Sequence, residues 1–150
     1  LNALESAFII RKISRYDVKG KAILQTNEKY FIGDHSLLYA VMGFKDRSLS
    51  GVLENIVFME LLGRGYEVYV GKLGDKEIDF IACRGEYKFY IQVSYRISDS
   101  EEEIEREYRP LLKVRDHYPK YVVTMDDFFQ DSIEGIRHIP LADFLLMDSF

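Results

Sequence analysis

The sequence has one cysteine and no long apolar segment, and each of these absences excludes a class of protein. Cys83 has no second thiol to pair with, so the chain forms no internal disulfide, and its place in an apolar run predicts a buried packing residue. No apolar run approaches the roughly 20 residues that span a bilayer, and the first residues lack the basic-then-apolar order of a secretory signal. We therefore expect a cytoplasmic protein with no membrane partner.

Two functional motifs are also missing. No G-x-x-x-x-G-K-[ST] stretch is present, so this chain is not expected to bind or hydrolyse ATP. The three histidines, His35, His117 and His138, lack the spacing of zinc ligands. The chain does have 47% apolar and 14% aromatic residues over 150 positions, which suffices for a real core. Because "LNALESAF" reads as the last turns of a helix and begins with leucine, we expect a piece of a longer polypeptide.

Charge is distributed unevenly along the chain. Residues 1–50 carry eight Lys and Arg against five Asp and Glu, whereas residues 51–150 carry twelve against twenty. Affinity for a phosphate backbone comes mainly from cations, so the acidic part is a poor general nucleic-acid binder. Its run "DSEEEIERE" predicts the first turns of a helix, where carboxylates interact well with the helix dipole.

In the basic part, cations crowd the stretch around "KGK". They are candidates for contacts with DNA phosphates, and they have an equally good reading as charges that protect a hairpin edge from pairing with other strands. The residues concerned are Arg11, Lys12, Arg15, Lys19 and Lys21.

The pattern of apolar residues predicts two units with a boundary near residue 48. In residues 1–48, "FIIRKISRYDV" and "EKYFIGD" flank the turn residues and predict a β-hairpin, and "HSLLYAVMG" predicts a helix that ends at Gly43. The segment "FKDRSLS" is polar and has no periodic pattern, which places the boundary there.

Residues 49–150 predict the order α, β, β, β, α, β, followed by a short strand and a short helix. "GVLENIVFMELLGRG" has apolar residues at helical spacing, and "YEVYVGK", "EIDFIAC" and "YKFYIQVSY" predict an antiparallel meander. "SDSEEEIEREYRPLLKVRDHY" predicts a helix with Ser98 or Ser100 at its N-cap and a kink at Pro110. The predicted class is α/β (α+β), a mixed sheet flanked by helices. The sheet is expected from residues 66–95 and 120–125, and the helices near 51–63 and 100–116.

The first helix with Glu54, the "EIDF" strand and the "YIQVSYR" strand resemble the PD-(D/E)XK restriction-endonuclease-like domain at the C-terminus of many bacterial and archaeal AAA-type P-loop ATPases. That domain is catalogued as one of unknown function. With "YPKYVVTMD" and "GIRHIPLADFLL", the resemblance covers about residues 51–148. Residues 1–48 resemble the final helix and wing of the winged-helix segment that precedes it. The resemblance implies an ATPase module in the same chain, which would hold the ATP.

The resemblance also implies a metal site with two departures. Nucleases of this type hold Mg²⁺ with carboxylates on neighbouring strands, and a Lys two positions after the second carboxylate lies on the same strand face. Asp79 matches the first ligand, whereas Gln92 replaces the second carboxylate and Ser94 replaces the Lys. Glu54 could add a carboxylate. Because Gln brings no charge and Ser brings no cation, we expect Mg²⁺ binding at Asp79 and Gln92 to be weak or vestigial.

Three hypotheses therefore stay open. The first is a catalytically degenerate nuclease-like domain that serves interaction or regulation. The second is an active Mg²⁺-dependent DNA nuclease that uses Glu54, Asp79 and Gln92. The third is a DNA-binding module that acts through the basic hairpin. Structural readings stand beside them, because Glu54 suits a helix N-terminus and Gln92 suits a local hydrogen bond, although a carboxylate inside an apolar strand needs donors.

Overall fold

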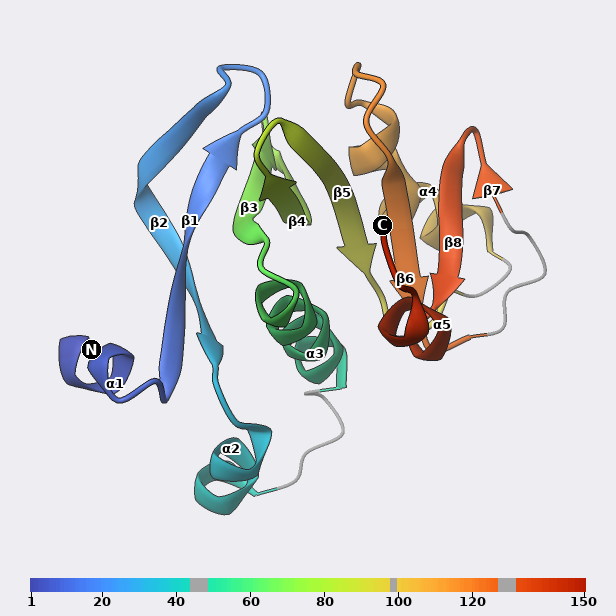
Figure 1. Ribbon diagram of the computed structural model, residues 1–150. Helices are drawn as coiled ribbons and strands as arrows, with labels where there is room; N and C mark the ends of the chain where they lie inside the picture. Colours follow the sequence, from blue (N-terminus) through green and yellow to red (C-terminus); the bar gives the residue numbers. More distant parts are fainter. Residues whose placement is uncertain (44–48, 98–99, 127–131) are drawn as a thin grey trace.

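The computed structural model describes residues 1–43, 49–97, 100–126 and 132–150. These residues form one eight-stranded mixed sheet with the strand order β2-β1-β3-β4-β5-β6-β8-β7 (Figure 1). The strands are β1 (Ile10–Asp17), β2 (Ala22–Ile32), β3 (Glu67–Leu73), β4 (Lys76–Arg84), β5 (Tyr87–Val93), β6 (Lys120–Thr124), β7 (Ser132–Ile133) and β8 (Ile136–Pro140). The helices are α1 (Asn2–Ser6), α2 (His35–Met42), α3 (Leu49–Gly63), α4 (Glu101–Leu112) and α5 (Leu141–Leu146).

The predicted meander is confirmed. β3, β4 and β5 pair antiparallel, while β5 pairs with β6 and β6 with β8 in parallel. The two tight turns of the meander contain Gly74 and Gly85 with φ of 66° and 61°, a conformation that residues with a Cβ rarely adopt. The mixed sheet flanked by helices is therefore as the sequence predicted.

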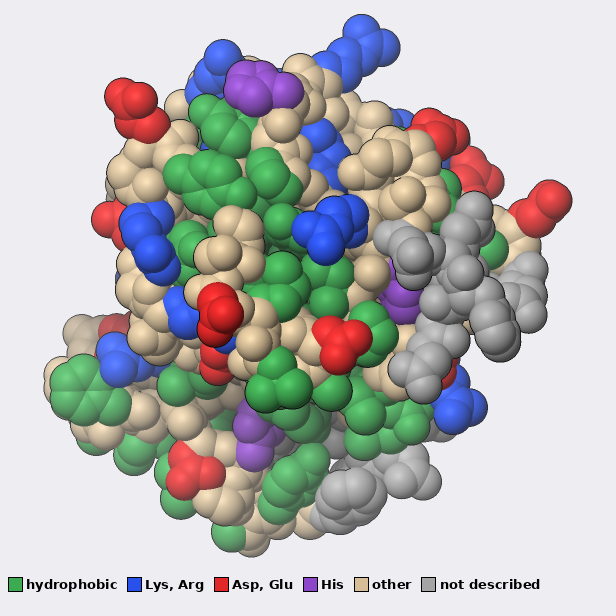
Figure 2. All heavy atoms as spheres, turned by 45° about the vertical axis from the view of Figure 1, so that its right-hand side comes forward, with side chains coloured by type: hydrophobic (Ala, Val, Ile, Leu, Met, Phe, Trp, Pro, Cys, Tyr) green, Lys and Arg blue, Asp and Glu red, His purple; other side chains and the backbone are tan. Residues whose placement is uncertain are grey.

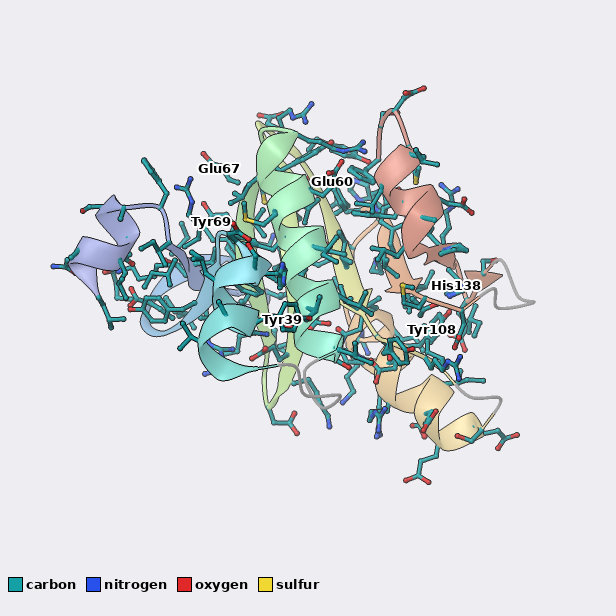
Figure 3. The ribbon with its side chains drawn as sticks, turned by 90° about the horizontal axis from the view of Figure 1, so that it is seen from below. Tyr39, Glu60, Glu67, Tyr69, Tyr108 and His138 are labelled. Carbon is teal, nitrogen blue, oxygen red and sulfur yellow. The ribbon has the colours of Figure 1, made fainter. Side chains whose placement is uncertain are left out.

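The helices cover both faces of the sheet and create two cores. One core lies under α3 and α5 and includes Phe58, Phe80 and Phe144, all fully buried. The other lies under α4 and includes Tyr90 and Tyr108. Seen from below, α3 and α5 lie on one side and α4 on the other (Figure 3). The aromatic residues serve mainly as core.

The N-terminal hairpin belongs to the same sheet. β1 pairs in parallel with β3, with Arg15 opposite Val70, and β2 forms an edge. Phe31 of β2 packs against Phe58 and Phe80, with ring centroids 4.5 and 5.5 Å away. The sequence did not indicate this union of the two predicted units. The boundary near residue 48 falls on residues 44–48, outside the described part of the chain.

The second long helix differs from its prediction. Ser100 is the N-cap and accepts a hydrogen bond from Glu103 N, whereas Ser98 lies outside the described residues. The helix ends at Leu112 rather than near residue 116, with Pro110 in its last turn. Asp116 instead accepts the backbone N–H of Tyr118, a turn geometry that competes with the helix.

Two smaller points complete the fold. Cys83 is half-buried rather than buried, because it lies at the margin of the second core. No helix within the described ranges is long and apolar enough to cross a membrane.

Candidate functional site

Asp79 lies at a bulge in the central strand β4. Tyr69 pairs with Ile81 and Gly71 with Ile78, so two residues of β4 face one residue of β3 between these pairs. A bulge bends the strand and redirects a side chain, and bulges are frequent beside functional sites. The Asp79 side chain is nevertheless enclosed, since the residue is only 8% exposed.

The Asp79 carboxylate is held by the neighbouring strand β5. Its Oδ2 accepts the backbone N–H of Val93 at 2.8 Å, and the backbone N–H of Asp79 donates to Gln92 Oε1 at 3.4 Å. Burial, and then the negative charge of Glu54, raise the pKa of Asp79 to about 7, although the Val93 amide and the Lys29 ammonium lower it. Asp79 therefore keeps its proton to a much higher pH than an ordinary carboxyl does.

Glu54, on α3, is paired with a lysine from the hairpin. Lys29 Nζ lies 2.7 Å from Glu54 Oε2 and 3.4 Å from Glu77 Oε1, and Glu77 also pairs with Arg15. Burial lowers the pKa of Lys29, but the hydrogen bond that it donates to Glu54 and the charges of Glu54, Asp79 and Glu77 raise it above its ordinary value. Lys29 is thus an ammonium ion enclosed by carboxylates, and we call Lys29, Glu54, Glu77 and Asp79 the ammonium cluster.

The ammonium cluster does not fit a divalent metal as it stands. One carboxylate oxygen of Asp79 accepts the Val93 backbone N–H, and Glu54 accepts a hydrogen bond from the Lys29 ammonium. The side-chain oxygen of Gln92 accepts the Asp79 backbone N–H. Within the described ranges, no three His, Cys, Asp or Glu side chains are grouped to hold a metal ion. A cation already balances the carboxylates, and it is supplied by the chain itself.

The Ser94 hydroxyl makes its contact outside this cluster. Ser94 follows β5 directly and is 8% exposed, and its hydroxyl donates to the Arg96 carbonyl at 3.0 Å. It lines a hollow of about 560 Å³ together with Arg96, Arg106 and Asp126. Of the predicted nuclease positions, Gln92 and Glu54 each lie beside Asp79, whereas Ser94 lines a hollow that none of the other three lines.

The predicted DNA-contacting cations are divided into two groups. Lys12 forms an ion pair with Glu28 at 3.0 Å, Arg15 pairs with Glu77, and the Arg11 guanidinium lies 4.6 Å from the centroid of the Phe8 ring. Lys19 and Lys21 stand in the turn between β1 and β2. Of these cations, Lys12 and Arg15 are paired with carboxylates, whereas Arg11, Lys19 and Lys21 have no ion pair among the described residues.

Two residues of the site region were not predicted from the sequence. Asn55 is 5% exposed and binds the backbone of Ile32, and a polar residue within the apolar pattern of this helix was a usable signal for it. Lys29 gave no such signal, because it is 25 positions from Glu54 and lies in the other predicted unit.

Comparison with known proteins gives relatives without an assigned function. The chain is 44% identical to an uncharacterized protein of Haemophilus influenzae over 146 residues, which covers 97% of this chain and 36% of that protein. It is 28% identical to an uncharacterized protein of Methanocaldococcus jannaschii over 156 residues, which covers 95% of this chain and 32% of that protein. The chain thus spans about a third of the length of these relatives. No family model and no solved structure matches it.

Proposed function

We propose that this chain is a nuclease-like domain whose metal site has become an internal ion-pair cluster, and that it serves interaction or regulation within a longer protein. The observation that carries the proposal is the position of Lys29, whose ammonium contacts Glu54 and Glu77 beside Asp79. An ammonium among carboxylates supplies the charge balance that Mg²⁺ supplies in an active nuclease, but it does not activate a water molecule.

The sequence departures support the same reading. Gln92 brings no negative charge where the resemblance implies a second carboxylate, and Ser94 lies in a separate hollow where the resemblance implies a lysine. The order of helices and strands agrees with a PD-(D/E)XK-type domain, and a fold of this kind carries many functions.

The longer protein is the proposed site of action. Both relatives are about three times as long as the part that this chain matches. The N-terminal segment carries several exposed apolar side chains, including Leu1, Phe8, Leu37 and Val41, the last 84% exposed. We propose that these side chains pack against the rest of the same protein, which by the resemblance is an AAA-type ATPase module with a winged helix. ATP would bind there and not in this domain.

The first experiment measures metal binding and cleavage. The purified chain is titrated with Mg²⁺ and Mn²⁺ by calorimetry and incubated with plasmid and single-stranded DNA. We expect weak metal binding and no cleavage, because each missing transition-state interaction of this kind typically costs about 10²-fold or more in rate. Cleavage that disappears in Asp79→Ala would instead establish the active nuclease.

A second experiment rebuilds the site. Gln92→Glu with Ser94→Lys restores the residues that the resemblance implies, but Lys29 still competes for Glu54. Lys29→Met removes the ammonium and keeps an apolar side chain near the Phe31 ring, which the Lys29 Nζ approaches to 5.5 Å. If the ammonium replaces the metal, Mg²⁺ affinity should rise at least tenfold in the triple variant relative to the double variant. Equal affinities of the two variants would contradict the proposal.

A further inference from the structure

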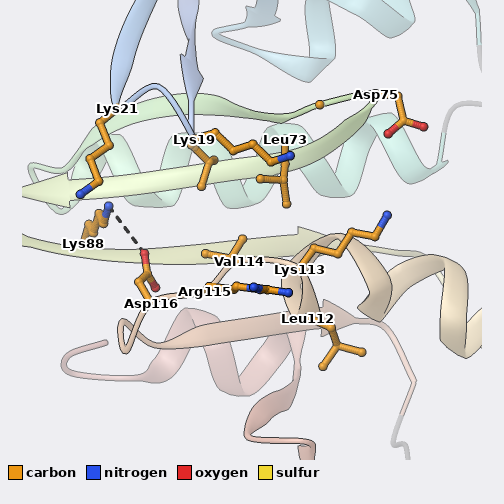
Figure 4. A pocket seen from close by; sticks show the side chains of 12 residues that line it. Lys19, Lys21, Leu73, Asp75, Lys88, Leu112, Lys113, Val114, Arg115 and Asp116 are labelled. Atoms are coloured by element: carbon orange, nitrogen blue, oxygen red, sulfur yellow. Dashed lines mark ion pairs between the residues drawn. The ribbon is translucent and has the colours of Figure 1, made fainter.

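A cavity of about 690 Å³ opens between the hairpin turn and the segment that follows α4. Five cationic side chains line it, whereas only two carboxylates, Asp75 and Asp116, do so. Figure 4 shows the cations reaching in from separate parts of the chain. They are Lys19, Lys21, Lys88, Lys113 and Arg115, and we call this site the basic groove.

Asp116 does not neutralise the cations of the groove, because its carboxylate already has partners within the protein. It accepts the Tyr90 hydroxyl at 2.6 Å and lies 3.4 Å from Lys120 Nζ and 3.7 Å from Lys88 Nζ. Although burial raises the pKa of Asp116, the hydrogen bonds from Tyr90 and Tyr118 and the two lysines hold it below its ordinary value. Asp116 is therefore ionised at neutral pH, and its charge is balanced inside the protein.

The other four cations have no ion-pair partner among the described residues. Lys19, Lys21, Lys113 and Arg115 are all exposed and stand around one opening, where like charges repel. This concentration contrasts with the net charge of −5 for the chain. On the face drawn in Figure 2, acidic and basic side chains are interspersed instead.

The backbone at Lys21 adds to the argument. Its φ is 52°, in the left-handed region that favours glycine, and the preceding residue is itself Gly20. An L-residue with a Cβ is strained in this conformation, so a lysine is less favourable here than a glycine would be.

We propose that the basic groove binds the phosphate backbone of a nucleic-acid strand. Cations on three separate elements suit a series of phosphates along a strand better than one phosphate group, and lysine and arginine are the side chains that neutralise such phosphates. None of Glu54, Asp79, Gln92 and Ser94 lines the groove, so this site is independent of the ammonium cluster.

The groove differs from the hairpin surface that the sequence suggested. Lys19 and Lys21 are common to both, but Lys88, Lys113 and Arg115 come from distant parts of the sequence. Lys12 and Arg15 are used in ion pairs within the protein and Arg11 covers the Phe8 ring. This division supplies a matched pair of variants for a test.

The experiment measures binding of fluorescein-labelled 20-nucleotide DNA, single-stranded and duplex, by anisotropy between 50 and 200 mM salt. The groove variant is Lys21→Gly with Arg115→Ala, and the control variant is Arg11→Ala with Lys12→Ala. Both remove two positive charges. Lys21→Gly also relieves the left-handed backbone, and Arg115 is exposed, so the groove variant should fold, which its thermal melting checks.

We expect the wild type to bind either form of DNA and the groove variant to bind at least tenfold more weakly at 50 mM salt. Its log Kd against log salt should lose about one to two units of slope, and the control variant should resemble the wild type. Absence of DNA binding by the wild type at 50 mM salt would overturn the proposal. So would an equal loss in both variants.

Discussion

Asn55 of α3 holds the main chain of Ile32, near the end of the edge strand β2, through two hydrogen bonds. Its Oδ1 accepts the Ile32 N–H at 2.9 Å and its Nδ2 donates to the Ile32 carbonyl at 2.7 Å. A side-chain amide offers the same donor and acceptor pair as a neighbouring strand, and the outer side of β2 has no such neighbour in the described sheet. The hairpin is therefore fastened to the helix that carries Glu54.

Replacing Asn55 should remove these two hydrogen bonds between α3 and β2. Asn55→Ala leaves a buried donor and acceptor without partners, and we expect the free energy of unfolding to fall by about 2–4 kcal/mol. Urea denaturation measures the loss, and hydrogen exchange should show faster exchange of the Ile32 amide. Ser50→Ala, at an exposed position of the same helix, is the control. A loss within 0.5 kcal/mol of that control would show that the contact contributes little.

Deleting the hairpin tests whether the two predicted units fold separately. A chain of residues 49–150 would expose the edge of β3 and the rings of Phe58 and Phe80 that Phe31 covers. Since an exposed apolar strand edge promotes aggregation, we expect this fragment to be unfolded or aggregated by circular dichroism and size-exclusion chromatography. Deletion of residues 1–6, none buried except in part, should leave the fold intact. A monomeric, cooperatively folded 49–150 fragment would contradict this prediction.

The meander was predictable because its strands and turns are local in sequence. The three strands are separated by two residues each, and Gly74 and Gly85 mark the turns. The parallel contact between β1 and β3 was not predictable in the same way, since it joins Arg15 to Val70 and depends on packing that no short pattern records. For the same reason, the sequence did not predict that Phe31 is a core residue shared by both units.

The site was predicted in part for a similar reason. The predicted strands placed Asp79 and Gln92 on neighbouring strands of the meander. In the structure, the backbone N–H of Asp79 donates to Gln92 Oε1. Ser94 was assigned to the same cleft by continuing the period-two alternation of the strand, but β5 ends at Val93 and the alternation ends with it. Lys29 could not be found, because its importance comes only from the docking of the hairpin.

The raised pKa of Asp79 predicts how stability depends on pH. The unfolded chain loses this proton near pH 4, whereas the folded protein keeps it until about pH 7. Stability from this group is therefore full below pH 4 and is lost as pH rises from about 4 to 7, by up to on the order of 4 kcal/mol. Asp79→Asn removes the titration and keeps an oxygen for the Val93 amide.

We therefore expect the difference in unfolding free energy, Asp79→Asn minus wild type, to increase with pH from 4 to 7 and to be constant above that range. Urea denaturation at several pH values measures it. Asp143→Asn, at an exposed carboxylate of α5, is the control for the loss of a charge. A difference that does not change with pH would show that Asp79 titrates as an ordinary carboxyl.

The last prediction separates the two charges that act on Asp79. Glu54 raises the pKa of Asp79 by repulsion and Lys29 lowers it by attraction, although the two partners are joined to each other at 2.7 Å. Glu54→Gln should therefore lower the pKa of Asp79 and Lys29→Met should raise it further, while the double variant should lie between them. The carboxyl ¹³C chemical shift of Asp79, followed by NMR through a pH titration, reports each value directly. If the ammonium cluster is an electrostatic unit, the single variants must move in opposite directions. Shifts in the same direction would mean that changes in burial, which raise the pKa of a carboxyl, outweigh both charges.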